Sequence, residues 1–267
     1  MGGAMGGELA AQLAIDALRR DLEQLPPRPP AVALKAATLE ANRVIVLRRS
    51  NPAFASMGTT IVAAMICDRE VGFCHAGDSR AYLVRDSAIQ QLTTDHTFVQ
   101  DLVDSGQIKV EEALSHPQAH VLTRCIGSEP GLRVDTSRYW LWDCEQGEKN
   151  DVLLLCSDGL YSLVSDGEIA NAVTTMPPQR ACVHLVDLAK RRGGFDNITV
   201  TVVPLDGHLK KEPPPGYQPK MHVPKTSALS NRKTSGVSIL ARFGIVAILS
   251  VVAALLTALA LAFQFLE

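Results

Sequence analysis

The stretch Val152-Leu153-Leu154-Leu155-Cys156-Ser157-Asp158-Gly159-Leu160 runs from an unbroken apolar segment directly into an acidic turn. A short apolar run without alternation is typical of a strand that is buried on both faces, in the centre of a sheet. An Asp that leaves such a strand can hold a ligand with accurate geometry, although Asp before Gly is also an ordinary turn signal. The stretch predicts a central strand with Asp158 at its carboxyl end.

The segment Asp196-Asn197-Ile198-Thr199 is the complementary case, with an acidic residue just before a strand that we expect at residues 198–203. Antiparallel neighbours place the end of one strand beside the start of the next. Two carboxylates held that close repel unless a cation or a proton lies between them. We therefore expect Asp158 and Asp196 to share a hard divalent cation such as Mg²⁺ or Mn²⁺.

The remaining chain predicts an α/β sandwich with antiparallel sheets. Four β-prone runs between residues 60 and 92, separated by short turns, indicate an antiparallel meander. Apolar residues at helical spacing predict helices at residues 9–18, 31–49, 98–105, 166–173 and 179–190. Strands first, with helices in pairs around them, favour an α+β fold.

Several side chains near these turns have more than one interpretation. His96 follows a predicted strand and fits either a metal ligand or a hydrogen-bonded loop residue. His75 lies inside a predicted strand, where a core residue is the simpler interpretation. Ser79 and Ser157 each adjoin an Asp, but the sequence has no Gly-x-Ser-x-Gly elbow. A serine hydrolase is therefore excluded.

Composition narrows the classes of function. The chain has 267 residues and a formal net charge of −2, and seven of its 26 Lys and Arg residues but only two of its 28 Asp and Glu residues lie after residue 206. The preceding part is acidic, which excludes a typical nucleic-acid-binding domain and suits one that concentrates metal cations. The six cysteines form no CxxC pair, so reduced thiols are expected rather than a disulfide framework or a zinc site.

The chain divides into three parts. Residues 1–206 have globular composition, residues 207–240 are a linker rich in Pro, Lys and Ser, and residues 241–265 are strongly apolar. Residues 243–263 contain no charge and are long enough to cross a bilayer as a helix. Lys and Arg on the amino-terminal side orient the main domain toward the cytoplasm. We expect a single-pass protein of the cytoplasmic membrane.

Together, the acidic segments resemble the metal-dependent protein Ser/Thr phosphatases of type 2C in their compact bacterial form. The resemblance covers residues 1–204. Its motifs are Gly77-Asp78-Ser79-Arg80, Leu92-Thr93-Thr94-Asp95-His96, Val99-Gln100-Asp101-Leu102-Val103, His116-Pro117, Val121-Leu122-Thr123-Arg124, Ser157-Asp158-Gly159-Leu160 and Asp196-Asn197-Ile198-Thr199.

The resemblance implies a four-layer α-β-β-α sandwich with two Mg²⁺ or Mn²⁺ ions in a cleft. It assigns Asp158 and Asp196 as metal ligands and adds Asp95 at a third, weaker metal. Residues 115–124 match a mobile flap, with His116, Thr123 and Arg124 as candidate substrate contacts. The motif residues with a supporting structural role are Asp78, Ser79, Arg80, Gly159 and Asn197. No protein side chain acts as a covalent catalyst in this scheme.

One departure from the family concerns the motif Asp-Gly-Met-Gly-Gly, of which this sequence has only Met1-Gly2-Gly3, followed by Gly6-Gly7-Glu8. The missing Asp would bridge both metals. Two expectations follow. Either Met1 is an internal residue of a longer active phosphatase, or the chain is an impaired phosphatase that acts as a membrane-tethered adaptor for phosphoproteins.

The expected substrates are proteins phosphorylated on Ser or Thr. Tethering through a linker raises the effective concentration of the domain near membrane proteins, so a membrane Ser/Thr kinase is the expected partner.

Overall fold

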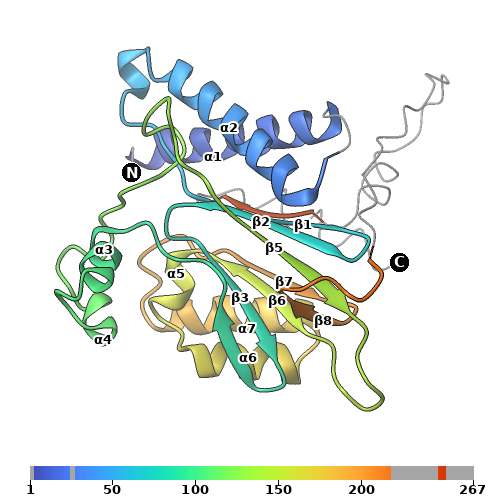
Figure 1. Ribbon diagram of the computed structural model, residues 1–267. Coiled ribbons are helices and arrows are strands. Elements are labelled where there is room, and N and C mark those ends of the chain that lie inside the picture. The colour runs from blue at the N-terminus through green and yellow to red at the C-terminus, as the bar shows by residue number, and fades with distance from the viewer. Residues whose placement is uncertain (1–2, 25–27, 218–245, 251–267) are drawn as a thin grey trace, which may run out of the picture.

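The computed structural model describes residues 3–24, 28–217 and 246–250, and within these the side chains of residues 6–24 and 28–217. Two antiparallel sheets stack face to face, and a pair of helices covers the outer face of each sheet (Figure 1). The predicted sandwich of two antiparallel sheets flanked by helices is confirmed.

The first sheet has the strand order β8-β5-β2-β1-β9. Its strands are β8 (His208–Lys210), β5 (Asp135–Trp142), β2 (Glu70–Ala76), β1 (Ile61–Cys67) and β9 (Val246–Ser250). Two long helices cover its outer face, α1 (Gly3–Gln24) and α2 (Pro30–Arg48). Both were expected, and α2 begins at Pro30, a position in the first turn where a helix tolerates Pro.

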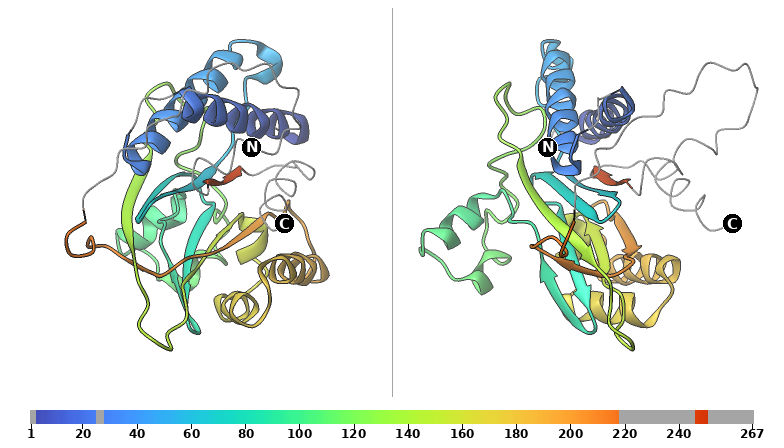
Figure 2. Two further views of the ribbon diagram at one scale, coloured as in Figure 1. Left: turned by 90° about the vertical axis from the view of Figure 1, so that its right-hand side faces the viewer. Right: turned by 45° about the vertical axis from the view of Figure 1, so that its right-hand side comes forward.

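The second sheet has the order β4-β3-β6-β7. Its strands are β4 (Ala88–Gln91), β3 (Arg80–Arg85), β6 (Val152–Cys156) and β7 (Val200–Pro204). Helices α6 (Asp166–Thr175) and α7 (Pro178–Arg191) pack on its outer face, and Figure 2 shows the four layers edge-on.

Strand β6 is buried on both faces, as its apolar sequence predicts. Leu153 and Leu155 join the core between the two sheets, whereas Leu154 and Cys156 pack against the helices α6 and α7. Because successive side chains of a strand point to opposite faces, a strand that is apolar throughout needs cover on both sides. In this fold, the first sheet covers one face of β6 and the layer of helices α6 and α7 covers the other.

The prediction of one antiparallel meander is wrong, because the chain changes sheets between β2 and β3. β1 pairs with β2 in one sheet, and β3 pairs with β4 in the other. The crossing occurs at Gly77, whose φ of +116° is rarely adopted by other residues. A Cβ there would also lie 2.3 Å from Thr60 Cγ2. A turn at this position was visible in the sequence, but the sheet in which the next strand pairs was not.

Three shorter segments complete the domain. The short helix η1 (Pro52–Phe54) follows α2, and α5 (Asp158–Tyr161) follows β6 directly. Helices α3 (Phe98–Asp104) and α4 (Val110–Ala113) form a lobe that projects beside the two sheets (Figure 2). The helix predicted at residues 98–105 is thus present, within one residue.

The predicted transmembrane helix at residues 241–265 lies mostly outside the described residues. Its described part, Val246–Ser250, is not helical: it forms β9 and pairs antiparallel with β1 at the sheet edge. A run of apolar residues is compatible with a helix in a bilayer and with a strand buried at a sheet edge, and the sequence alone does not distinguish these two structures. No helix in the described parts of the chain is both long and apolar enough to span a membrane.

Candidate metal centre and its surroundings

The end of β6 and the loop that precedes β7 are joined by several hydrogen bonds. β6 and β7 are antiparallel neighbours with Cys156 opposite Val200. The Ser157 amide donates to the Thr199 carbonyl at 3.1 Å, and Ser157 Oγ donates to the Asn197 carbonyl at 3.0 Å. This pairing brings the segments of Asp158 and Asp196 together, as the sequence predicted from antiparallel geometry.

Gly159 permits this close approach. A Cβ at this position would lie 2.5 Å from the Asn197 carbonyl oxygen, which is a backbone atom and cannot rotate away. The Gly of the Ser-Asp-Gly motif therefore has a steric role, because any side chain would push the two acidic loops apart.

The two carboxylates are oriented by neighbouring amides. Asp158 Oδ1 accepts a hydrogen bond from the Gly159 amide at 2.9 Å, and Asp196 Oδ1 accepts one from the Asn197 amide at 2.7 Å. Burial raises the pKa of Asp158, and the charge of Asp196 raises it further. Oxygen donors that repel one another in this way fit a hard divalent cation, which would relieve the repulsion.

A third carboxylate, Asp78, interacts with the charge of Asp158. Its side chain is 6% exposed, and burial together with the charges of Asp158 and Asp95 raises its pKa to about 7. The hydroxyl of Tyr161 in α5 donates to the Asp78 carbonyl at 3.0 Å, and this bond ties α5 to the sheet-crossing loop. Asp78 was predicted to be structural, but its position adds a third acidic group to the centre.

Asp95, predicted as a ligand of a third metal, is held by other side chains. Arg80 Nη2 donates to its Oδ2 at 2.7 Å, Arg80 Nε contacts both oxygens at 3.0 Å, and Gln91 Nε2 donates to Oδ1 at 3.0 Å. The Arg80 guanidinium also stacks 3.6 Å from the ring centre of Tyr161. These contacts give Asp95 a scaffolding role in this structure, and its assignment to a third metal stays a prediction.

The segment predicted as a flap approaches the centre through a residue that sequence reasoning passed over. His120, 62% exposed, places Nδ1 at 3.8 Å from Asp158 Oδ2. His116, the predicted contact, instead accepts a hydrogen bond from the Gln118 amide. Thr123 is exposed, and its amide donates to the His96 carbonyl. His120 belongs to no motif of the sequence, so only the loop geometry could single it out.

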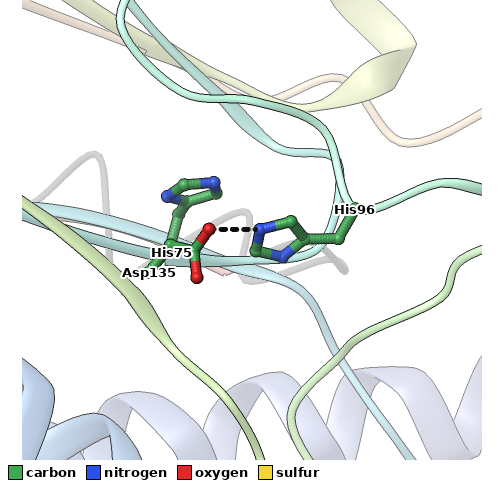
Figure 3. Close-up of side chains that lie close together, drawn as sticks. All are labelled: His75, His96 and Asp135. Carbon is green, nitrogen blue, oxygen red and sulfur yellow. Dashed lines mark hydrogen bonds and ion pairs between the residues drawn. The ribbon is translucent and has the colours of Figure 1, made fainter. Parts of the chain in front are cut away.

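Arg124 anchors the flap to a network drawn in Figure 3. Its Nη1 donates to Asp135 Oδ1 at 2.8 Å, and His96 Nε2 donates to Asp135 Oδ2 at 3.3 Å. His96 Nδ1 in turn accepts from the Gly77 amide at 3.1 Å. Burial lowers the pKa of His96 to about 4, so the ring is neutral near pH 7. The network links the flap to the loop that carries Asp78.

His75, His96 and Asp135 also lie close enough to suggest a metal site. The two imidazole rings, however, are stacked with centroids 4.5 Å apart and planes only 22° apart (Figure 3). Imidazole donates its lone pair in the ring plane, so near-parallel stacked rings cannot both point at one ion. His75 Nε2 is also paired with the Thr94 carbonyl at 2.9 Å. We interpret the group as a structural network, which favours the hydrogen-bonded alternative for His96.

Replacing Asp135 with Asn should reduce the acid sensitivity of folding. Burial raises the pKa of Asp135, but the hydrogen bond and charge of Arg124, together with the hydrogen bond from His96, outweigh it and lower the pKa to about 2. A lowered folded-state pKa stabilises the protein above the unfolded value of about 4, and this contribution is lost as pH falls toward 2. Melting temperatures between pH 5 and pH 2 should fall less steeply for Asp135→Asn. Parallel curves would contradict the assignment.

Comparison with known proteins places these features in a family. The family described as "Protein phosphatase 2C" matches residues 2–101. Serine/threonine phosphatase stp of Listeria monocytogenes is 34% identical over 213 residues, which cover 77% of this chain and 82% of that protein. The chain therefore belongs to the protein phosphatase 2C family of metal-dependent protein phosphatases, as the motifs predicted.

Two comparisons concern a mycobacterial relative. Serine/threonine protein phosphatase PstP of Mycobacterium tuberculosis H37Rv is 39% identical over 206 residues. The match covers 76% of this chain but 38% of PstP, so the chain spans well under half of that relative's length. A crystal structure of the PstP catalytic domain in complex with two manganese ions has a TM-score of 0.64 and 37% identity, and covers 76% of this chain and 83% of that one.

The sequence left open whether the protein is an active phosphatase or an impaired one that acts as an adaptor, and the names of the relatives bear on this choice. Those named above are called phosphatases, and nothing in the comparisons supports an impaired phosphatase or adaptor. None of the six cysteines forms a disulfide in the structure.

Proposed function

We propose that the protein is a Mg²⁺- or Mn²⁺-dependent phosphatase that hydrolyses phosphoserine and phosphothreonine in proteins. The observation that carries this proposal is the juxtaposition of Asp158 and Asp196 at the β6–β7 strand ends, in a chain of this family. When bound, two such cations supply Lewis-acid activation of water and neutralise charge on the phosphoryl group.

The residues of this chain supply binding and orientation. Asp158 and Asp196 would hold the ions with the oxygens that their own loop amides leave available, and Asp78 adds negative charge beside them. His120 lies on the solvent side of Asp158, where a phosphoprotein would approach. A third, more weakly held cation is proposed at Asp95, whose carboxylate also pairs with Arg80.

Removal of divalent metal should abolish activity reversibly. The purified protein should hydrolyse a phosphothreonine peptide in the presence of Mn²⁺, lose this activity with excess chelator, and regain it when Mn²⁺ is restored. Release of inorganic phosphate measures the reaction. Turnover that persists in chelator would overturn the metal-dependent mechanism, and absence of turnover with either Mn²⁺ or Mg²⁺ would overturn the proposed activity.

We also propose that residues 241–265 anchor the protein in the cytoplasmic membrane as a single span, with the phosphatase domain in the cytoplasm. The support is the uncharged run 243–263 and the basic residues before it. The residues of β9 belong to this run, and they cannot pair with β1 and cross a bilayer together. Anchoring therefore requires that β9 leave the sheet edge. Membrane phosphoproteins, including a Ser/Thr kinase, are the proposed substrates.

Deleting residues 241–267 should move the protein from the membrane to the soluble fraction. The full chain should stay in the membrane pellet through high-salt and alkaline washes and enter solution only with detergent, because a spanning segment is held by apolar burial rather than by charge. In a reconstituted assay, the full chain should prefer a vesicle-bound phosphopeptide over the same soluble peptide, and the shortened chain should not. A soluble full-length protein would refute the anchor.

A further inference from the structure

A second group of metal-ligating side chains lies away from the acidic centre. Cys144 and Glu148 belong to the loop between β5 and β6, and His208 is the first residue of β8. The thiol, a carboxylate oxygen and an imidazole nitrogen all lie within 4.8 Å of one another. Trp142, at the end of β5, pairs with His208, and this pairing brings the loop and β8 together.

Each of the three side chains is oriented by a hydrogen bond from the loop itself. His208 Nε2 lies 2.9 Å from the Lys149 carbonyl, to which it can only donate. Glu148 Oε2 accepts from the Glu145 amide at 2.9 Å, and the Cys144 thiol donates to Asn150 Oδ1 at 3.1 Å with a proton that metal binding would displace. Histidine ligands of metals characteristically donate their second ring nitrogen to a carbonyl or carboxylate in this way.

The charged groups around this cluster are mostly acidic. Because Nε2 of His208 donates to the Lys149 carbonyl, Nδ1 is the ring nitrogen that faces Glu148 Oε2, at 3.5 Å. The carboxylates that interact with Cys144 are Glu148, Asp151 and Asp206, against one cation, Arg85. A cation between the three side chains would bind Nδ1 and offset the excess negative charge.

The geometry points to a zinc site formed by Cys144, Glu148 and His208. Thiolate, imidazole and carboxylate are the ligands of Zn²⁺, which takes them tetrahedrally at about 2.0–2.3 Å and often keeps one position for water. In that geometry ligand atoms lie about 3.3–3.8 Å apart, so an exposed loop would have to close by about 1 Å. A soft thiolate selects against Mg²⁺ and Mn²⁺, which separates this site chemically from the acidic centre.

The site also lies at the other end of the sheets. β6 begins just after the β5–β6 loop and ends just before Asp158, and its five residues span about 17 Å. In Figure 1 this loop extends from the lower right of the molecule, opposite the end of β6 where α5 begins. Zinc here would fasten the loop to β8 without entering the phosphatase reaction.

Zinc content tests the site directly. The full chain, freed of metal by chelation, is incubated with Zn²⁺ in excess Mg²⁺, separated from free metal, and analysed for bound zinc. Cys144→Ser should lose one equivalent relative to the wild type, and Cys182→Ser, at another half-buried thiol in α7, should lose none. With Co²⁺ in place of Zn²⁺, the wild type and Cys182→Ser should show a thiolate-to-cobalt charge-transfer band that Cys144→Ser lacks.

Two conservative variants keep the test independent of folding. Glu148→Gln alters only an exposed carboxylate, and His208→Gln retains a donor for the Lys149 carbonyl. Each should weaken Zn²⁺ binding by at least about tenfold. Equal zinc content in the wild type and Cys144→Ser, or a cobalt spectrum without the thiolate band, would overturn the proposal and leave a protonated His208 facing Glu148.

Discussion

Replacing Asp158 with Asn should lower phosphatase turnover by more than about 100-fold. Losing even a residue that only hydrogen-bonds a metal ligand, without touching the metal, already costs about 10–100-fold. The amide is nearly isosteric but brings no charge, so it cannot hold a divalent cation beside Asp196. Turnover of a phosphothreonine peptide at saturating Mn²⁺ measures the effect.

The same variant should remain folded. Burial and the charge of Asp196 raise the pKa of Asp158 above its unfolded-state pKa. The metal-free protein is therefore destabilised as the pH rises from the unfolded-state pKa through the raised folded-state pKa. Asn removes this cost, and the metal-free variant should melt no lower than the metal-free wild type at neutral pH. Asp86→Asn is the matched control, because this exposed residue sits in the β3–β4 turn with φ of +55°, a conformation that Asn tolerates. Unchanged turnover in Asp158→Asn would remove Asp158 from the metal centre.

Replacing Arg80 with Met should destabilise the domain by about 3–5 kcal/mol, the typical cost of breaking a buried ion pair from one side. The Arg80 side chain is 16% exposed and Asp95 8% exposed, so Asp95 would be left as an uncompensated buried charge. Met retains much of the apolar contact with Tyr161 but none of the hydrogen bonds to Asp95 or to the Tyr82 hydroxyl. Chemical denaturation measures the change.

Two further variants separate charge burial from packing. Adding Asp95→Asn to Arg80→Met should recover a large part of the lost stability, because no charge then remains buried without a partner. Arg43→Met, which breaks the exposed pair with Glu40 on α2, should leave the denaturation midpoint unchanged within error. If Arg80→Met were as harmless as Arg43→Met, Asp95 would be free to serve as a metal ligand instead of a scaffold.

Local sequence predicted many elements of this fold, because the relevant signals are local, but it did not predict strands β5 and β8. The apolar run of β6, the acidic turn after it and the Pro-bounded helices α1 and α2 each follow from neighbouring residues. The pairing of the strands was harder to predict from the sequence than their positions. Residues 61–91 read as one meander, yet the chain changes sheets at Gly77, because pairing depends on which partner strand lies alongside.

In the candidate metal centre, too, local sequence predicted some features and missed those that depend on contacts between distant residues. Asp158 and Asp196 were identified from strand-end motifs, and antiparallel pairing of β6 with β7 brings their loops together. The ion pair of Asp95 was not visible in the sequence, because it depends on Arg80 reaching across to Asp95. His120 likewise gains its place only from the path of the flap.

The sequence by itself determined the family, the central strand and the two acidic loops, since these are written in short motifs and their order. Only the tertiary structure decided which carboxylates face the centre and which are held in ion pairs, because contacts between distant residues depend on strand pairing. It also brought Cys144 and Glu148 to His208, about sixty residues later. Cysteine spacing had argued against zinc, but spacing along a chain does not measure distance between side chains in a folded sheet.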